Sequence, residues 1–188
     1  MINIRLSSYH GVVFAMYLIA LPIVYLLFPE IFRYHYLVNQ SVILCLFFTL
    51  IGLVSYVLWK RKRTETEEVH FGISRILEII FYSTLFAVPE EILFRGLLQT
   101  YLSSIFNSGL FIIIFSSLIF GFAHIFNGSI GLHPKHWNWK LAGIACTGGL
   151  PLGYLFLLTG SLLLPTLLHM VYLIALRLFL SQRHDFLK

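Results

Sequence analysis

The sequence predicts an all-α fold: a polytopic transmembrane helical bundle of about six spans plus an interfacial or kinked helix. Composition is the first observation behind this prediction. Apolar residues make up 59% of the 188 residues and charged residues only 11%, whereas an ordinary globular chain carries roughly 25% charged residues. The second observation is a series of apolar runs close to the ~20 residues that cross a bilayer. A chain of this size cannot bury so much apolar surface in one core, so the surplus must face lipid.

The first two expected spans cover residues 11–28 and 41–59. No cleavage site follows the first run, so we expect a retained span rather than a signal peptide. The basic cluster Lys60–Arg63 and the acidic residues after it form the clearest linker. We therefore divide the chain into N-terminal helices with a basic linker, residues 1–70, and a C-terminal core, residues 71–188.

Residues 71–104 are apolar but interrupted. Their first part carries a polar stripe at helical spacing, typical of a helix that tilts or lies in the membrane interface. Pro89 is expected to start a new helical piece, because proline suits the first position of a helix. Glu90 would then lie in a first turn, where free N–H groups favour an anion. A turn at Asn107–Gly109 ends the segment.

The remaining spans are expected at residues 110–126, 141–158 and 162–181. In the run at residues 141–158, small residues recur every four positions: Ala145, Gly149 and Gly153. Small residues at this spacing let helices approach closely in lipid. We expect this stripe to pack the span against its neighbours.

The net charge of +5 arises mainly from Lys and Arg residues between apolar runs, so it indicates membrane orientation rather than nucleic-acid binding. With about six spans, nearly all these bases fall on one side, which places both termini in the cytoplasm. The compact size favours a bacterial plasma membrane.

Cys45 and Cys146 lie inside apolar runs, where they resemble small core residues more than disulfide partners.

Five ionisable residues lie well inside the apolar segments of residues 71–188: Glu90, Glu91, Arg95, His124 and His169. An ionisable residue within a membrane segment is costly and marks a functional site by default. Glu91 and Arg95 are four residues apart with the acid first, the favourable order for a helical ion pair. Glu90 points about 100° away from that pair on a helix. Its carboxylate is therefore the one left for chemistry.

Chain spacing brings Glu90 and His124 to one depth. Each lies 17 residues from Asn107, which is about 25 Å along a helix. In a helical hairpin the two side chains would face each other. A straight helix from Ser161 would leave His169 only about 12 Å from the outer face. A tilt, or a helix that starts deeper at Pro165, is needed to bring His169 to the same level.

These residues together resemble the motifs of the CPBP family, which contains the CAAX proteases and bacteriocin-processing enzymes and is also called Abi. The motifs are Glu90–Glu91–x–x–x–Arg95, Phe120–x–x–x–His124, and Thr159–Gly–Ser–Leu162 leading to His169. The resemblance covers roughly residues 73–175. Each motif alone is weak, but all three in order, each in an apolar span, form a specific pattern.

The resemblance implies a glutamic-type intramembrane endopeptidase that needs no cofactor and no metal. Glu90 corresponds to the catalytic base, which activates a water together with His124. Glu91 and Arg95 correspond to residues that hold the base helix, and His169 helps to stabilise the oxyanion. The implied partners are the lipid bilayer and a membrane-anchored peptide or protein, such as a lipidated peptide or a C-terminal sorting tail.

One position departs from the family pattern. Members often carry Asn four residues after the last histidine, where this chain has Leu173. Tyr172 is the candidate replacement as oxyanion donor, although it lies about 100° away around the helix.

Several alternatives stay open: a non-catalytic scaffold, an immunity or regulatory protein, and a small proton-coupled transporter. Zinc binding by the glutamates and histidines is compatible with their ligand types, but the Glu91–Arg95 pair competes for one ligand. Two other protease classes are disfavoured. The chain has no His-Glu-x-x-His motif, and its only Asp, Asp185, cannot form an aspartyl dyad.

Overall fold

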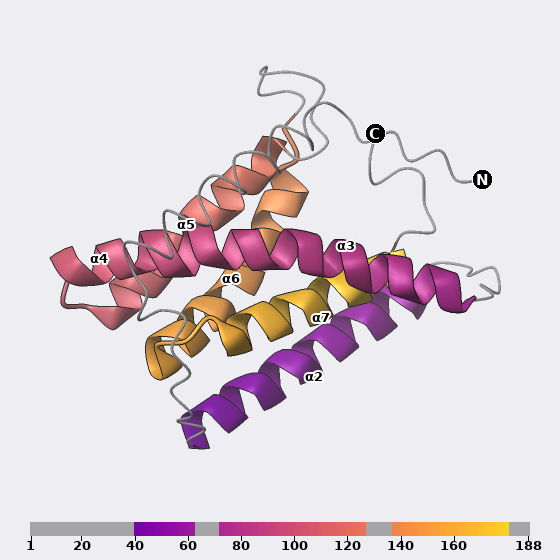
Figure 1. Ribbon diagram of the computed structural model, residues 1–188, viewed down its shortest axis with the longest axis horizontal. Coiled ribbons are helices and arrows are strands. Elements are labelled where there is room, and N and C mark those ends of the chain that lie inside the picture. The colour runs from indigo at the N-terminus through magenta and orange to yellow at the C-terminus, as the bar shows by residue number, and fades with distance from the viewer. Residues whose placement is uncertain (1–39, 63–71, 127–136, 181–188) are drawn as a thin grey trace.

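The computed structural model describes residues 40–62, 72–126 and 137–180, and the regular structure in these ranges is helical throughout. The all-α prediction is therefore confirmed for this part of the chain. The expected span at residues 11–28 and both termini lie outside the described residues. In chain order the elements are α2 (Gln40–Lys62), α3 (Ile73–Glu91), the π-helical segment η2 (Ile92–Gln99), α4 (Thr100–Ile105), α5 (Gly109–Ala123), the short 3₁₀ turn η3 (His124–Phe126), α6 (Trp139–Thr159) and α7 (Leu163–Leu180) (Figure 1).

The helix around Pro89 is continuous, which corrects the expectation that a new helix starts there. Pro89 lies inside α3, and α3 runs directly through η2 into α4. Glu90 is therefore near the end of α3 and not in a first helical turn. Proline is tolerated inside membrane helices because neighbouring helices and local widening of the ladder accommodate the lost N–H. Here the π-helical segment, with i to i+5 hydrogen bonds, follows within one turn of the proline.

The chain reverses into α5 at residues 106–108, one residue earlier than the expected turn at Asn107–Gly109, because Gly109 is already the first residue of α5. The side chain of Ser108 caps α5 by accepting a hydrogen bond from the N–H of Phe111. This reversal lays α5 back along η2 and α4, while α6 packs along α5 and α7 packs along α3 and α6. Helix α2 runs beside α6 and α7 (Figure 1).

The stripe of small residues on α6 has the packing role expected for it. A Cβ atom added at Gly149 would lie 3.2 Å from Ser117 of α5, and one at Gly153 would lie 3.1 Å from Gln99 of η2. A second close approach occurs at Gly121, where an added Cβ would lie 2.7 Å from the Cβ of Cys146. Helix α6 therefore sits directly against the two helices that carry the first two motifs.

The turn between α6 and α7 explains how His169 reaches the site. Gly160 adopts the left-handed conformation that ends α6, with φ of 61°, which glycine adopts without steric cost. Thr159 and Ser161 around it are buried. Leu162 packs in a core cluster with Ile92 at the start of η2. The turn is thus folded into the bundle, and α7 begins at a depth that brings His169 level with the end of α3.

The outer surface of the helices is apolar. Large hydrophobic side chains are exposed on every long helix, for example Phe48 on α2, Phe81 on α3 and Leu110 on α5. Within the described residues, α6 is long and apolar enough to cross a membrane. Shorter apolar helices occur at Gln40–Ser55, Gly109–Ala123 and Leu163–Arg177. The count of six spans stays a prediction.

Candidate active site

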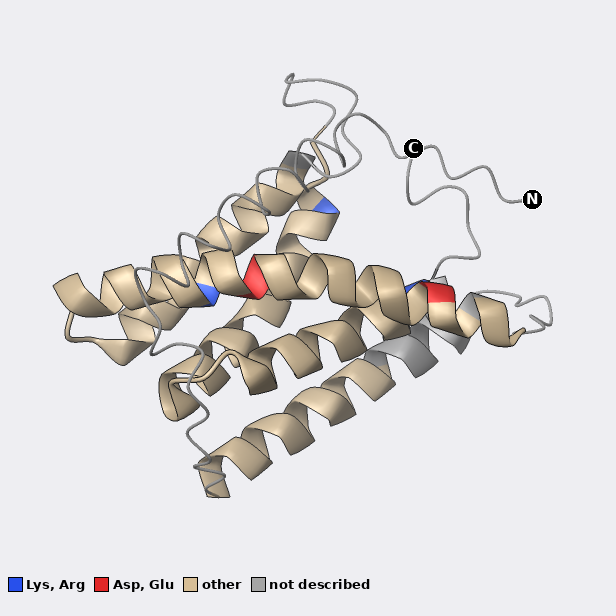
Figure 2. Ribbon diagram, in the orientation of Figure 1, with Lys and Arg blue, Asp and Glu red and all other residues tan. Residues whose placement is uncertain are grey.

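Charged residues are sparse on the described helices, and one group of them lies in the interior. Figure 2 shows an acidic and a basic position side by side midway along the continuous helix that contains α3 and η2. The side chains of Glu91 and Arg95 are 0% and 1% exposed, and that of Glu90 is 13% exposed. Burial of three ionised groups in an apolar bundle is costly unless they are paired and hydrogen-bonded.

Glu91 and Arg95 form the ion pair that their spacing predicts. Arg95 Nη1 donates to Glu91 Oε1 at 3.0 Å. Arg95 Nη2 donates to the carbonyl oxygen of Gly149 on α6, also at 3.0 Å. One turn further on, Gln99 Nε2 donates to the carbonyl of Gly153 at 2.8 Å. These two side-chain bonds attach η2 to α6, so the helix that carries both glutamates is held in a fixed position.

Glu90 faces both motif histidines, as the spacing argument expects for His124. Its Oε2 lies 3.6 Å from Nε2 of His124, which follows the end of α5. The same Oε2 lies 3.7 Å from Nε2 of His169 on α7. Both distances exceed the usual hydrogen-bond range of about 2.7–3.2 Å. Two histidines from distant parts of the chain, one after α5 and one on α7, therefore face the same carboxylate oxygen of α3.

The other ring nitrogen of each histidine fixes how the ring is oriented. His124 Nδ1 lies 2.8 Å from the carbonyl oxygen of Phe120, and a carbonyl only accepts, so Nδ1 carries the proton. His169 Nδ1 lies 2.8 Å from Oε1 of Glu91, which as a carboxylate also accepts. Both histidines thus direct Nε2 toward Glu90. Carboxylates and carbonyls commonly hold functional histidines in this way.

The aromatic ring of Phe120 packs against three side chains of the cluster. Its ring centroid lies 4.5 Å from the ring of His124 and 5.7 Å from the ring of His169. The guanidinium carbon of Arg95 lies 4.6 Å from the same centroid, which is a cation–π geometry. Phe120 is 2% exposed, so its buried ring contacts all three side chains in the interior of the bundle.

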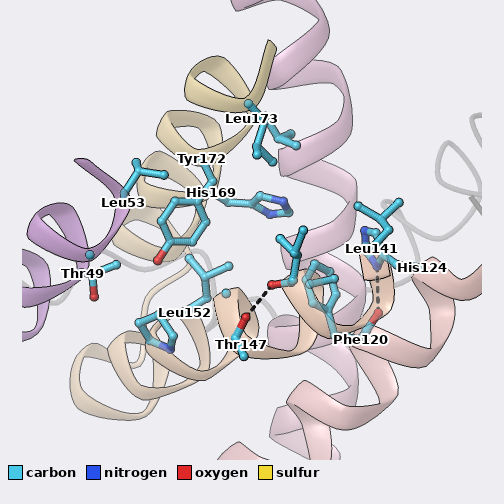
Figure 3. Close-up of a pocket in the computed structure, with 16 residues that line it drawn as sticks. Thr49, Leu53, Phe120, His124, Leu141, Thr147, Leu152, His169, Tyr172 and Leu173 are labelled. Carbon is cyan, nitrogen blue, oxygen red and sulfur yellow. Dashed lines mark hydrogen bonds between the residues drawn. The ribbon is translucent and has the colours of Figure 1, made fainter. Parts of the chain in front are cut away.

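An apolar cavity of about 430 Å³ adjoins the two histidines (Figure 3). His124 and His169 form part of its wall, and Leu173 lines it as well. Tyr172 also lines the cavity, but in Figure 3 its hydroxyl points away from the His169 ring, toward the side where α2 passes. The structure therefore does not bring the Tyr172 hydroxyl to the glutamate and the histidines.

Some relationships were not predicted from the sequence. The bond between Glu91 and His169 joins residues 78 positions apart, and no local spacing indicates it. The hydrogen bond from Gln99 to the Gly153 carbonyl of α6 was not predicted either, although a polar residue within an apolar run is a signal for such a bond. No group of three or more His, Cys, Asp or Glu side chains within the described ranges has a geometry suited to a metal ion.

The described part of the chain is an all-helical bundle with an apolar exterior and a buried cluster of glutamates, arginine and histidines. The model of the type II CAAX prenyl endopeptidase Rce1-like family matches residues 72–175, more than half of the chain. The chain belongs to this family of membrane proteases, and the family expected from the motifs is confirmed. Neither the curated proteins nor the solved structures contain a significant match to the chain.

Proposed function

We propose that this protein is a glutamic-type intramembrane endopeptidase that hydrolyses a peptide bond of a membrane-associated substrate, through a water activated by Glu90 and His124. The observation that carries the proposal is the position of Glu90 Oε2, 3.6 Å from His124 Nε2 and 3.7 Å from His169 Nε2. A water beside this pair that donates hydrogen bonds to both Glu90 Oε2 and His124 Nε2 would be within reach of a general base and of a substrate carbonyl at the same time. Family membership supplies the reaction class, a proteolytic one.

The first step of the proposed reaction uses Glu90 and His124. Because His124 Nδ1 is protonated toward Phe120, the Nε2 of a neutral His124 accepts a hydrogen bond from the water. Glu90 takes the proton as the water oxygen attacks the carbonyl carbon of the substrate. The C–N bond then breaks, and Glu90 returns the proton to the leaving amine, so it ends the cycle as a carboxylate.

His169 is the proposed stabiliser of the oxyanion. Glu90, Glu91 and Arg95 sum to one negative charge when all are ionised, and an uncompensated charge inside a membrane protein is costly. A protonated His169 neutralises the cluster, with Glu91 on its Nδ1 side. Its Nε2–H can then donate toward the oxygen on which negative charge develops, which is a large contribution to acyl-transfer catalysis.

Glu91 and Arg95 are proposed as positioning residues. They contact each other, His169 and the α6 backbone, so they set the direction of His169 and the depth of the Glu90 helix.

We further propose that the chain spans the bilayer about six times with both termini in the cytoplasm of a bacterial cell. In this proposal residues 71–188 form the protease core and residues 1–70 precede it.

A second candidate function is a non-catalytic scaffold, which one observation favours. The position of the family's Asn is occupied by Leu173, and the Tyr172 hydroxyl is directed toward α2 (Figure 3). The site therefore has one oxyanion donor fewer than the family pattern. A regulatory or immunity role would keep the fold and dispense with turnover.

The two functions are separated by the Glu90→Gln variant, which keeps the size of the side chain and removes the base. Purified wild type and variant are reconstituted in liposomes with a library of membrane-tethered peptides, with and without a chelator. A matched control is Glu78→Gln, the same change on the same helix, α3, away from the histidines. Loss of a general base lowers turnover by about 10²–10⁴-fold.

Cleavage that disappears in Glu90→Gln, persists in Glu78→Gln and survives chelation supports the glutamic mechanism. If the wild type cleaves no peptide while Glu90→Gln still complements the wild-type phenotype in cells, the scaffold is the function. Cleavage that a chelator abolishes would instead replace the glutamic mechanism with a metal-dependent one.

A further inference from the structure

A group of buried polar side chains lies where η2 contacts both α5 and α6. Arg95 and Gln99 belong to η2, and Ser117 belongs to α5. All three residues are at most 1% exposed. Within the described part of the chain, one atom of each has no hydrogen-bond partner: Arg95 Nε, Gln99 Oε1 and Ser117 Oγ. Buried polar atoms in native proteins are nearly always bonded to protein or to water, so these three atoms indicate a ligand.

Two glycines of α6 show that these atoms lie close together. A Cβ atom added at Gly149 would lie 3.3 Å from Ser117 Oγ, and one added at Gly153 would lie 3.1 Å from Gln99 Oε1. The guanidinium of Arg95 reaches the same place, because its Nη2 donates to the Gly149 carbonyl at 3.0 Å. Gly149 and Gly153 are about one helical turn apart. The three atoms therefore surround a single turn of α6.

The hydrogen bonds that surround these atoms leave them no partner of their own. A serine inside a helix can donate to the carbonyl four residues earlier, which for Ser117 is that of Ile113. That carbonyl belongs to the α5 ladder and also accepts from the Ser116 hydroxyl at 3.1 Å, so both of its lone pairs are in use. The amide of Gln99 is fixed as well, because only its nitrogen can donate to the Gly153 carbonyl at 2.8 Å.

The three atoms together have the hydrogen-bonding pattern of a water site. The Nε–H of Arg95 only donates, Gln99 Oε1 only accepts, and the Ser117 hydroxyl can do both. A water molecule can accept from the first, donate to the second and bond to the third, which gives the roughly three hydrogen bonds typical of a buried water. A cation would be repelled by the guanidinium, and an anion would face the amide oxygen, so a neutral ligand suits the site.

We propose that a water molecule is bound between η2, α5 and α6, hydrogen-bonded to Arg95 Nε, Gln99 Oε1 and Ser117 Oγ. This water joins α5, whose end carries His124, to the continuous helix that carries Glu90. The inference goes beyond the proposed function, because it concerns how the helices are bonded to each other. It holds whether or not the chain cleaves peptides.

Solid-state NMR of the protein in bilayers tests for this water directly, through magnetisation transfer from water protons. In the wild type, transfer is expected to the Nε–H of Arg95 and to the side-chain amide of Gln99, but not to the backbone N–H of Leu155, which is 0% exposed on α6. Ser117→Ala removes one of the three hydrogen bonds, so transfer to Arg95 is expected to be lost. Ser83→Ala is the matched control and is expected to leave the transfer unchanged.

Ser83 is a suitable control because its hydroxyl shares two properties with that of Ser117. It is 0% exposed, and it has no hydrogen-bond partner within the described ranges. It differs in position: Ser83 lies eight residues before Glu91, about 12 Å along the helix. The other unpartnered buried atoms of the described residues belong to Glu91, Arg95, Gln99 and Ser117, so a water at Ser83 would lack the partners that the proposed site offers.

Thermal unfolding of the same two variants gives a second readout with a sign. A buried hydroxyl without any partner destabilises the fold, so Ser83→Ala is expected to raise the unfolding midpoint. A hydroxyl bonded to a water contributes to stability, and its removal leaves that water short of a partner. Ser117→Ala is therefore expected to lower the midpoint, although the two substitutions are chemically identical.

Loss of water transfer in Ser117→Ala together with a lowered midpoint supports the bound water. Three other results would overturn it. A wild type without transfer to Arg95 would show that the site holds no water. Transfer that persists in Ser117→Ala would assign the water to the neighbouring Glu90 cluster. A midpoint that rises in Ser117→Ala as it does in Ser83→Ala would show that the Ser117 hydroxyl is simply unpaired.

Discussion

The carboxylate of Glu91 joins His169 at 2.8 Å across 78 positions of sequence. The same oxygen, Oε1, accepts from Arg95 at 3.0 Å. Glu91 therefore connects four elements, since it bonds Arg95 of η2 and His169 of α7, and Arg95 in turn binds the Gly149 carbonyl of α6. This arrangement keeps Glu91 out of the proposed chemistry and makes it the residue that aligns α3, η2, α6 and α7 around Glu90.

The first prediction concerns the stability of this ion pair. Glu91→Gln or Arg95→Met alone leaves one buried charge without its partner, and such a change costs about 3–5 kcal/mol in unfolding free energy. The double variant Glu91→Gln/Arg95→Met removes both charges and is expected to recover most of that loss. Thermal unfolding of the four proteins in detergent measures the coupling. Additive losses in the double variant would show that the two side chains do not stabilise each other.

A second prediction separates this structural role from the proposed positioning of His169. In the double variant an amide replaces the carboxylate beside His169 Nδ1, and a neutral acceptor holds the ring less strongly than a carboxylate does. We expect kcat to fall by about 10-fold or more, because a preorganised donor to the oxyanion is lost, with KM little changed. Steady-state kinetics on a tethered peptide measure kcat and KM separately. Retention of the wild-type kcat would show that the Glu91 carboxylate does not position His169 for the reaction.

Local spacing was sufficient to predict much of this site. Glu91 and Arg95 lie four residues apart and form their pair. Glu90 and His124 are equally far from the turn after α4, and they meet. Both predictions depend only on helical periodicity, which is strongly marked in apolar segments. The expected role of Gly149 and Gly153 in close packing followed from the same periodicity.

Helical periodicity could not predict where the backbone hydrogen bonds of a helix continue, or how helices far apart in the sequence pack together. Pro89 was expected to start a helix, but tertiary packing holds α3 and η2 as one continuous helix through it. The depth of His169 depended on the buried turn at Leu162, which no local pattern indicates. The contribution of α2 to the cavity likewise depends on how α2 leans against α6 and α7.

The third prediction uses glycines to measure how closely α5 and α6 approach. An added Cβ at Gly121 would lie 2.7 Å from the Cβ of Cys146 and 2.8 Å from the backbone oxygen of Ala142. The backbone cannot yield easily, so Gly121→Ala is expected to destabilise the fold by about 1–3 kcal/mol through overpacking. Gly143→Ala, with nothing within 4 Å, is expected to be neutral or to stabilise by up to about 1 kcal/mol, because alanine favours helix. Equal unfolding midpoints for the two variants would contradict the observed contact.

The last prediction addresses the missing carboxamide of the family pattern. Leu173 lies one helical turn after His169 and lines the same cavity, so Leu173→Asn places an amide donor beside the proposed oxyanion position. One such donor contributes about 10²–10³-fold to kcat in other acyl-transfer enzymes, and we expect a gain of at least about 10-fold here. Leu176→Asn is the control, because Leu176 lines the cavity a further turn from the histidine and gains the same polar group. A gain in kcat for Leu173→Asn alone would place the oxyanion between positions 169 and 173. Equal loss of activity in both variants would mean that the cavity tolerates no polar group and that His169 acts without a neighbour on α7.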